Sequence, residues 1–189
     1  MNNSPRIETE RLLLTWPNDE QINQYYNDIL NSNMFDTILW DGPEGESDLP
    51  DYWKNAKLTN PNEFEQKLSF AIIKKDSHEY IGGCDYRPVG NSHFVVDIGF
   101  ALAPKFHNQG FATEAIKGLV HEAFQRRGAI RVCGTVFVGN TPSRRVFEKL
   151  DFTLEGTLRG VAYKRGEWLD EWMMGIIKND WKNSEVYKT

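Results

Sequence analysis

The clearest periodic pattern in the chain runs over residues 112–124, where apolar residues recur every three or four positions. These apolar residues are Ala112, Ala115, Ile116, Leu119, Val120, Ala123 and Phe124. Their i, i+3, i+4, i+7 spacing is that of an amphipathic helix. Gly128 follows, and glycine is favoured just past a helix end. The pattern therefore predicts a long helix that stops before Gly128.

Apolar stretches that precede this helix predict strands. Residues 68–75, 80–89 and 93–104 read LSFAIIKK, YIGGCDYRPV and HFVVDIGFALAP, with short connections between them. Three such strands predict an antiparallel meander that ends at Pro104. A further short apolar run, Arg11–Trp16, is stopped by Pro17 and predicts a first strand.

The segments after the helix complete a mixed α/β sheet. Residues 129–138, AIRVCGTVFV, predict a strand, and the long helix before it allows a parallel βαβ crossover. Residues 140–150 predict a second helix, with Asn140 or Thr141 as its cap. Residues 152–181 predict two more strands, joined across residues 164–167.

The N-terminal part of the chain is less regular. Apolar residues in 19–33 have the spacing of an amphipathic helix. Gly, Pro, Asn and Asp interrupt every pattern in 34–61 except LPDYWKNA, which predicts short helices and loops there. We expect this irregular region to line a substrate cleft.

Composition narrows the function classes. The chain has 189 residues, 40% hydrophobic and 13% aromatic, which suffices for one globular domain over 1–189. Its net charge of -5 argues against nucleic acid or an anionic membrane as a partner and favours a cationic substrate. The N-terminus has no export-signal pattern, and no window approaches a membrane span. We expect a cytoplasmic protein.

The two cysteines, Cys84 and Cys133, have no metal-ligand spacing. They predict buried thiols in strands and no metal site, which suits a reducing compartment.

The segment PKFHNQGFATEA, residues 104–115, joins a predicted strand to the predicted long helix. A strand, a turn of small residues and a helix together offer free backbone N–H groups and a positive helix end to an anion such as a phosphate. Gly110 permits close approach, and Ala112 and Thr113 leave the first turn uncrowded. An ordinary strand-to-helix turn is the alternative. The segment is neither a dinucleotide fingerprint nor a P-loop.

Residues 97–120, DIGFALAPKFHNQGFATEAIKGLV, resemble the acetyl-coenzyme A signature of the GNAT superfamily of N-acetyltransferases. The likeness is strongest to the RimJ/RimL-like subgroup, which acetylates the N-termini of ribosomal proteins. Four other segments stand in the expected order: IETERLLL before this stretch, and NTPSRRVFEKLDF, LEGTLR and GEWLDEWMMGIIKNDW after it. The resemblance therefore spans the chain. It implies the GNAT fold: a mixed, mainly antiparallel twisted sheet with flanking helices and a central βαβ cofactor-binding unit.

The resemblance also implies acetyl-CoA as co-substrate, without a metal, and assigns residues to it. Pantetheine would lie along Phe100, Ala101 and Leu102, where splayed strands leave backbone groups free. The pyrophosphate would lie on the turn formed by His107, Asn108, Gln109, Gly110, Phe111, Ala112 and Thr113. His107 stands where the family usually has Gln or Arg, and a loop or helix-cap role is its alternative.

Asn140 and Ser143 match the family's Asn-x-x-Ser pattern. The resemblance implies that Asn140 bonds the cofactor and that Ser143 delivers a proton to the departing sulfur, although both residues are also common helix caps. Many relatives use a tyrosine at the position of Phe147, which cannot donate. Asp97 takes the place of a frequent Glu and is the candidate base, with a solvated strand carboxylate as the alternative. Asp151 replaces a common glycine, which puts the local turn geometry in question.

The predicted reaction is acetyl transfer to a primary amine in a ternary complex, most favourably a protein N-terminal α-amino group. Such an amine has a pKa of about 8, so about a tenth of it is already neutral at pH 7. A small amine such as an antibiotic or polyamine is the rival acceptor, and a non-catalytic acetyl-CoA sensor is the rival class. The sequence leaves open a monomer or a homodimer.

Five other residues of the C-terminal part have both a functional and a structural interpretation. Arg144 and Arg145 either pair with the adenosine phosphates or are solvated. Tyr163, Trp168 and Trp172 are expected in the core rather than in the acceptor cleft.

Overall fold

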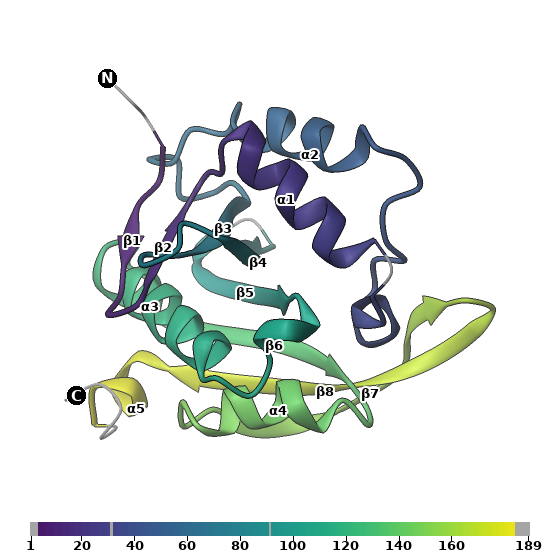
Figure 1. Cartoon of the computed structure of the whole chain (residues 1–189). Helices are drawn as coiled ribbons and strands as arrows, with labels where there is room; N and C mark the ends of the chain where they lie inside the picture. The colour runs from purple at the N-terminus through teal and green to yellow at the C-terminus, as the bar shows by residue number, and fades with distance from the viewer. Residues whose placement is uncertain (1–3, 31, 91, 184–189) are drawn as a thin grey trace.

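The computed structural model describes residues 4–30, 32–90 and 92–183 and contains one eight-stranded mixed sheet with helices packed against it (Figure 1). The strand order is β1-β2-β3-β4-β5-β6-β8-β7. The strands are β1 Ile7–Glu8, β2 Leu12–Thr15, β3 Leu68–Lys74, β4 Tyr80–Val89, β5 Ser92–Leu102, β6 Arg131–Phe137, β7 Thr153–Lys164 and β8 Glu167–Ile177. The helices are α1 Asp19–Ile29, α2 Asp48–Ala56, α3 Phe111–Gln125, α4 Thr141–Glu148 and α5 Lys178–Asn183, with 3-10 turns η1 Met34–Thr37 and η2 Pro104–Phe106. The predicted domain limits, 1 and 189, lie outside the described residues and stay a prediction.

The predicted architecture is confirmed. Strands β3, β4 and β5 form the antiparallel meander, and β5, α3 and β6 form the parallel crossover. The hairpin between β7 and β8 turns at Arg165 and Gly166, both with positive φ, as a tight two-residue hairpin loop requires. The sequence did not predict that β8 inserts between β6 and β7, nor the short elements β1 and α5. Helix α5 exists because Trp181 is fully buried beside Phe124, with ring centroids 6.3 Å apart.

The pairing of β5 with β6 is short, and this shortness creates the site. Val95–Asp97 pair with Arg131–Cys133, and the ladder stops there, although β5 continues to Leu102 and β6 to Phe137. Helix α4 packs at the divergence, where the Phe147 ring lies 5.7 Å from that of Phe100. A Cβ on Gly134 would lie 2.5 Å from Cζ of Phe147, so only glycine lets the ring approach β6 this closely.

The other end of the sheet carries α1 and α2, which lie over β3 and β4 (Figure 1). Tyr25 of α1 stacks on Tyr80 of β4 with ring centroids 4.1 Å apart, and Trp53 of α2 meets the same ring edge-on. Asn18 and Gln21 form a reciprocal capping box that fixes the start of α1. The region 34–61 contains the short helices η1 and α2 joined by loops, as predicted.

Two expectations about aromatic residues are wrong. Tyr163 and Trp168 are 57% and 68% exposed and pair with each other near the tip of the β7–β8 hairpin rather than in the core. That hairpin extends past the body of the sheet (Figure 1), and the face that carries Tyr163 and Trp168 is left uncovered. Trp172, nearer the body, is half-buried under the Arg144 guanidinium, 4.7 Å from the ring centroid.

Cys84 and Cys133 are free buried thiols in β4 and β6, as predicted. Within the described residues, no cluster of three or more His, Cys, Asp or Glu side chains is placed to hold a metal ion. Of the helices described, none has both the length and the apolar composition needed to cross a bilayer.

Candidate active site

The turn before α3 presents a row of backbone amides. The amides of Phe106 and His107 are already bonded to the carbonyls of Ala103 and Pro104, at 2.9 and 3.1 Å. The first helical bond of α3 runs from Glu114 N to Gly110 O, so the first-turn amides before Glu114 have no partner inside the helix. Across the described residues, no acceptor bonds the amides of 108–113. The amides without a partner are thus those of 108–113, so His107, the first residue of the predicted turn, does not contribute its N–H.

The backbone of this turn is held in the shape that points amides outward. Asn108 and Gly110 both have left-handed φ values, +60° and +82°, and Gly110 is the N-cap of α3. Alternation of this kind around Gln109 gathers successive N–H groups into a concave anion-binding nest. The His107 ring lies 2.9 Å from Leu102 O, so this side chain braces the turn against the end of β5.

Arg11 clamps the turn from the start of β2 and was missed by the sequence analysis. Its Nη1 donates to Gln109 O at 3.1 Å, its Nε donates to Glu114 at 2.6 Å, and its guanidinium lies 4.5 Å from the centre of the Phe111 ring. Thr9 adds a 2.6 Å hydrogen bond to the same carboxylate. Almost one hundred residues separate Arg11 from this turn in the sequence, and no local signal connects them.

The free edge of β5 offers further backbone groups beyond Asp97. Ala103 N donates to Ile81 O in β4, and backbone direction alternates along a strand. Gly99 and Ala101 therefore direct their N–H and C=O groups to β4, whereas Phe100 and Leu102 direct theirs to the side from which β6 has departed. The resemblance assigned Phe100, Ala101 and Leu102 alike. The register leaves available the backbone groups of Phe100 and the N–H of Leu102, whose C=O is already bonded to the His107 ring, and leaves Ala101 as a small residue beside them.

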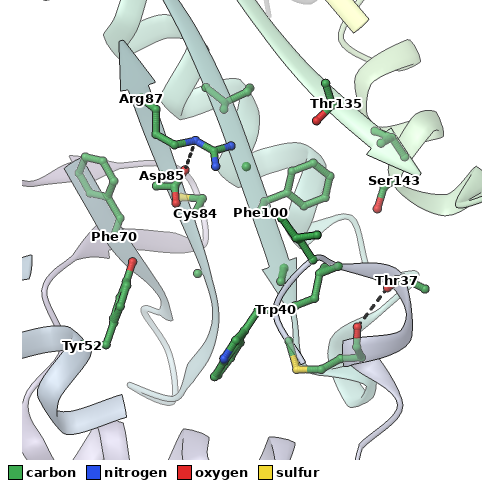
Figure 2. Close-up of a pocket in the computed structure, with 18 of the residues that line it drawn as sticks. Thr37, Trp40, Tyr52, Phe70, Cys84, Asp85, Arg87, Phe100, Thr135 and Ser143 are labelled. Atoms are coloured by element: carbon green, nitrogen blue, oxygen red, sulfur yellow. Dashed lines mark hydrogen bonds and ion pairs between the residues drawn. The ribbon is translucent and has the colours of Figure 1, made fainter. Parts of the chain in front are cut away.

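Asn140 and Ser143 lie across the gap on α4. Asn140 is the helix cap, since its Oδ1 accepts from Ser143 N at 3.2 Å, while its Nδ2 donates to Thr37 O at 3.1 Å. The capping alternative is thus observed. The Asn140 side chain also connects α4 to η1 through its bond to Thr37. Among the described residues, none hydrogen-bonds the Ser143 hydroxyl, which points into the open space beside Phe100 and Thr135 (Figure 2).

A cavity of about 900 Å³ connects this gap to the cover formed by α1, η1 and α2. Ser143, Asn140, Phe100 and Ala101 line one part of it. The other part is aromatic: Figure 2 shows Trp40, Tyr52 and Phe70 around the open space, facing Phe100. The cavity thus joins the predicted acetyl-transfer point to an apolar chamber suited to an acceptor.

Charged residues lie on the cavity wall formed by β4. Arg87 lies between two carboxylates: it forms an ion pair with Asp97 across the β4–β5 register, and its Nε is 3.4 Å from Oδ1 of Asp85. Burial raises the pKa of the Asp97 carboxyl, and the Arg87 guanidinium offsets this rise only in part. Asp97 is not among the residues that line the cavity, because it lies at the last paired position of β5.

The loop that carries Trp40 is latched to the β7–β8 hairpin. Lys164, only 4% exposed, bonds Asp41 at 2.6 Å, and Arg165 bonds Asp36 at 2.7 Å. Together with the bond from Asn140 to Thr37 O, these contacts hold the loop over the cavity.

The structure therefore brings most of the predicted residues to two adjoining places. Residues 108–113 form the amide nest, and Phe100, Ala101, Asn140 and Ser143 line the cavity. Arg144 bonds Glu148 at 2.7 Å and stacks on Trp172, which favours its structural interpretation. Asp151 has a left-handed φ of +60°, which explains why a glycine is common there and why the turn geometry is kept.

Comparison with known proteins identifies the class of enzyme. The acetyltransferase (GNAT) domain family matches residues 11–153, about three quarters of the chain, so the chain belongs to that family. It is an acetyl-CoA-dependent N-acetyltransferase.

The chain is similar to the following three acetyltransferases. An uncharacterized N-acetyltransferase of Bacillus subtilis, YnaD, is 28% identical over 93% of this chain and 98% of its own length. The [ribosomal protein uS5]-alanine N-acetyltransferase of Escherichia coli is 23% identical over 93% of this chain and 92% of its own. The microcin C7 self-immunity acetyltransferase MccE, solved with acetyl-CoA and AMP, has a TM-score of 0.79 at 22% identity, over 89% of this chain and 93% of that one.

Proposed function

We propose that this enzyme acetylates the α-amino group of a protein N-terminus and that the observed geometry divides the work between backbone and side chains. The amides of 108–113 bind the pyrophosphate, and the free edge of β5 at Phe100 and Leu102 holds the pantetheine. When bound, acetyl-CoA supplies the activated acetyl group as a thioester. Asn140 orients α4 toward it, and Ser143 gives a proton to the sulfur that leaves.

One observation carries this proposal: β5 leaves β6 after Asp97, and the free Ser143 hydroxyl lines the same cavity as Phe100. A thioester between them lies within reach of both a backbone donor and a proton source, the two aids that acyl transfer to an amine requires. The sequence assignment of Asp97 as the base stays a prediction.

The uS5-alanine acetyltransferase supports a protein N-terminus as acceptor, because it matches this chain over almost its full length. A small amine is the second candidate. The aromatic lining by Trp40, Tyr52 and Phe70 favours it, since such a chamber fits a compact amphipathic molecule.

A turnover panel separates the two candidates. Peptides that begin with Ser or Ala, aminoglycosides and polyamines are each mixed with acetyl-CoA, and free thiol is followed. We expect kcat/KM to be highest for the peptides. Inert peptides together with turnover of an aminoglycoside or polyamine would replace the first candidate with the second, and no thiol release from any amine would contradict the proposal as a whole.

A further inference from the structure

Glu171 brings a carboxylate into the cavity from the sheet face opposite α4. It lies in β8, and its neighbour Trp172 packs under Arg144 of α4. Because successive side chains of a strand point to opposite faces, Glu171 points to the other face, the one covered by α1 and α2. It is half-buried and lines the same cavity as Ser143 and Phe100.

Glu171 differs from the other acidic residues of the cavity wall because it is half-buried and has, among the described residues, neither a counter-charge nor a hydrogen-bond donor. Asp85 is paired with Lys67 at 3.2 Å and with Arg87 at 3.4 Å. Asp48 accepts from the amides of a neighbouring turn, and Asp51 is solvent-exposed on α2. Within the part of the chain that the structure describes, no donor or cation pairs with the Glu171 carboxylate, whereas Asp97, the sequence-based candidate, is paired with Arg87.

The strand register places Glu171 at the level of the predicted acetyl group. Asp97 is the partner of Cys133, so continuing that register would set Gly99 opposite Thr135 and Ala101 opposite Phe137. The strands diverge over this interval. Phe137 is the partner of Glu171 in β8, so Glu171 lies across β6 from the level at which Phe100 and Ala101 border the gap.

We propose that Glu171 is the catalytic group that receives the proton of the acceptor amine, an inference that rests on the proposed acetyl transfer. Its carboxylate first attracts the ammonium form and then takes a proton, leaving a nitrogen lone pair. That nitrogen forms a bond to the acetyl carbon while the carbon–sulfur bond breaks. A second proton on nitrogen leaves to solvent, and the Ser143 hydroxyl protonates the thiolate. Solvent then returns a proton to Ser143, and the Glu171 carboxyl releases to solvent the proton it took. Proton acceptor and proton donor then reach the reaction from opposite faces of the sheet.

Glu171→Gln tests this, because it keeps the shape and removes the charge. We expect kcat/KM for the acceptor to fall about 100-fold or more, the range for loss of a general base. Acetyl-CoA affinity, measured by calorimetry, stays within about twofold, since Glu171 is not assigned to the cofactor. Glu167→Gln, an exposed glutamate at the other end of β8, removes the same charge and leaves turnover unchanged.

Two further readouts distinguish a base from a structural residue. In Glu171→Gln, the rise of kcat/KM with pH moves to the alkaline range in which the amine itself loses its proton. In Glu171→Ala, added formate restores part of the lost activity. Wild-type-like turnover in Glu171→Gln would overturn the inference, and a loss in Asp97→Asn alone would assign the base to Asp97. Equal losses of activity and acetyl-CoA affinity would also overturn it. An inactive wild type would contradict the proposed function, which is a separate result.

Discussion

The cofactor half of the molecule and the acceptor half are built in different ways. The cofactor half is one stretch of chain, residues 97–152, in which β5, the amide nest, α3, β6 and α4 follow one another. The acceptor half combines α1, η1 and α2 with side chains from β4 and β8. The proposed cofactor site uses main-chain groups on a continuous segment, and the proposed acceptor site uses side chains that the chain supplies from distant positions.

This difference shows how one scaffold serves many amines. Backbone amides at a helix start bind a phosphate whatever the neighbouring side chains are, so that half tolerates changes such as His107 in place of Gln or Arg. The acceptor half depends on which side chains line the cavity, such as Trp40 and Glu171. Each of the following substitutions changes one half of the molecule. A measurable property of the other half should stay unchanged and serves as the control.

Gly110→Glu has the largest expected effect. Gly110 has a φ of +82°, and a Cβ there would lie 3.3 Å from Nη2 of Arg11, so glutamate would strain the turn, disturb the Arg11 clamp and bring a negative charge beside the proposed pyrophosphate site. We expect acetyl-CoA affinity to fall about 100-fold or more, as for an unpaired charge opposite a buried anion. Gly128→Glu is the matched control: it has a similar φ of +72° and open space around it, so it carries the same backbone strain far from the nest. Near-normal affinity of Gly110→Glu by calorimetry would refute the nest.

Ser143→Ala comes next and separates chemistry from binding within the cofactor half. Loss of the proton donor should lower kcat about 100-fold, with acetyl-CoA affinity nearly unchanged because the α4 cap uses Ser143 N rather than its hydroxyl. Ser143→Thr keeps a hydroxyl and should recover much of the rate. Unchanged turnover in Ser143→Ala, by thiol release, would remove Ser143 from the reaction.

Asp41→Asn weakens the latch of the acceptor half. It leaves the buried Lys164 ammonium without its carboxylate, so the loop that carries Trp40 loses its anchor. We expect the acceptor KM to rise about fivefold, equivalent to about 1 kcal/mol of lost loop positioning, with acetyl-CoA affinity unchanged. Asp36→Asn, in the same loop, removes a bond between two exposed residues and should change KM less. An equal effect of both variants would contradict a role for the burial of Lys164.

Glu114→Gln has the smallest expected effect and concerns the clamp on the nest. Burial raises the pKa of Glu114, but hydrogen bonds from Thr9 and Arg11 outweigh it, so its pKa lies below the ordinary value in the folded state. The stability from this pair is therefore present above about pH 4.3, the ordinary glutamate pKa, and is lost as pH falls through the folded pKa.

Thermal melts of Glu114→Gln between about pH 7 and pH 3 test this. The expected change in the free energy of unfolding is below about 1 kcal/mol, because the pair is partly exposed. The variant should be slightly less stable than wild type at neutral pH and should lose less stability on acidification. Glu65→Gln, at an exposed glutamate, is the control. A wild-type acid slope in Glu114→Gln would show that the clamp does not depend on this charge.

Sequence reasoning reached the cofactor half because its signals are local. The apolar spacing of α3, the small residues at Gly110 and Ala112, and the cap of α4 by Asn140 are each set by residues a few positions apart. It missed Arg11 and Glu171, because nothing near an isolated charge in a strand pattern tells which distant segment it will meet. It also placed Tyr163 and Trp168 in the core, since a strand pattern does not reveal that a hairpin extends past its sheet.

By itself the sequence determined the order of the longer strands and helices, the parallel crossover and the place of the turn that we propose as the phosphate site, because hydrogen bonding and apolar periodicity act over short chain distances. Only the tertiary structure decided where β5 leaves β6, which backbone groups of β5 stay free, and which carboxylate stands unpaired in the cavity. These properties depend on side-chain volumes and charges that meet across the sheet, such as Phe147 against Gly134 and Arg87 against Asp97.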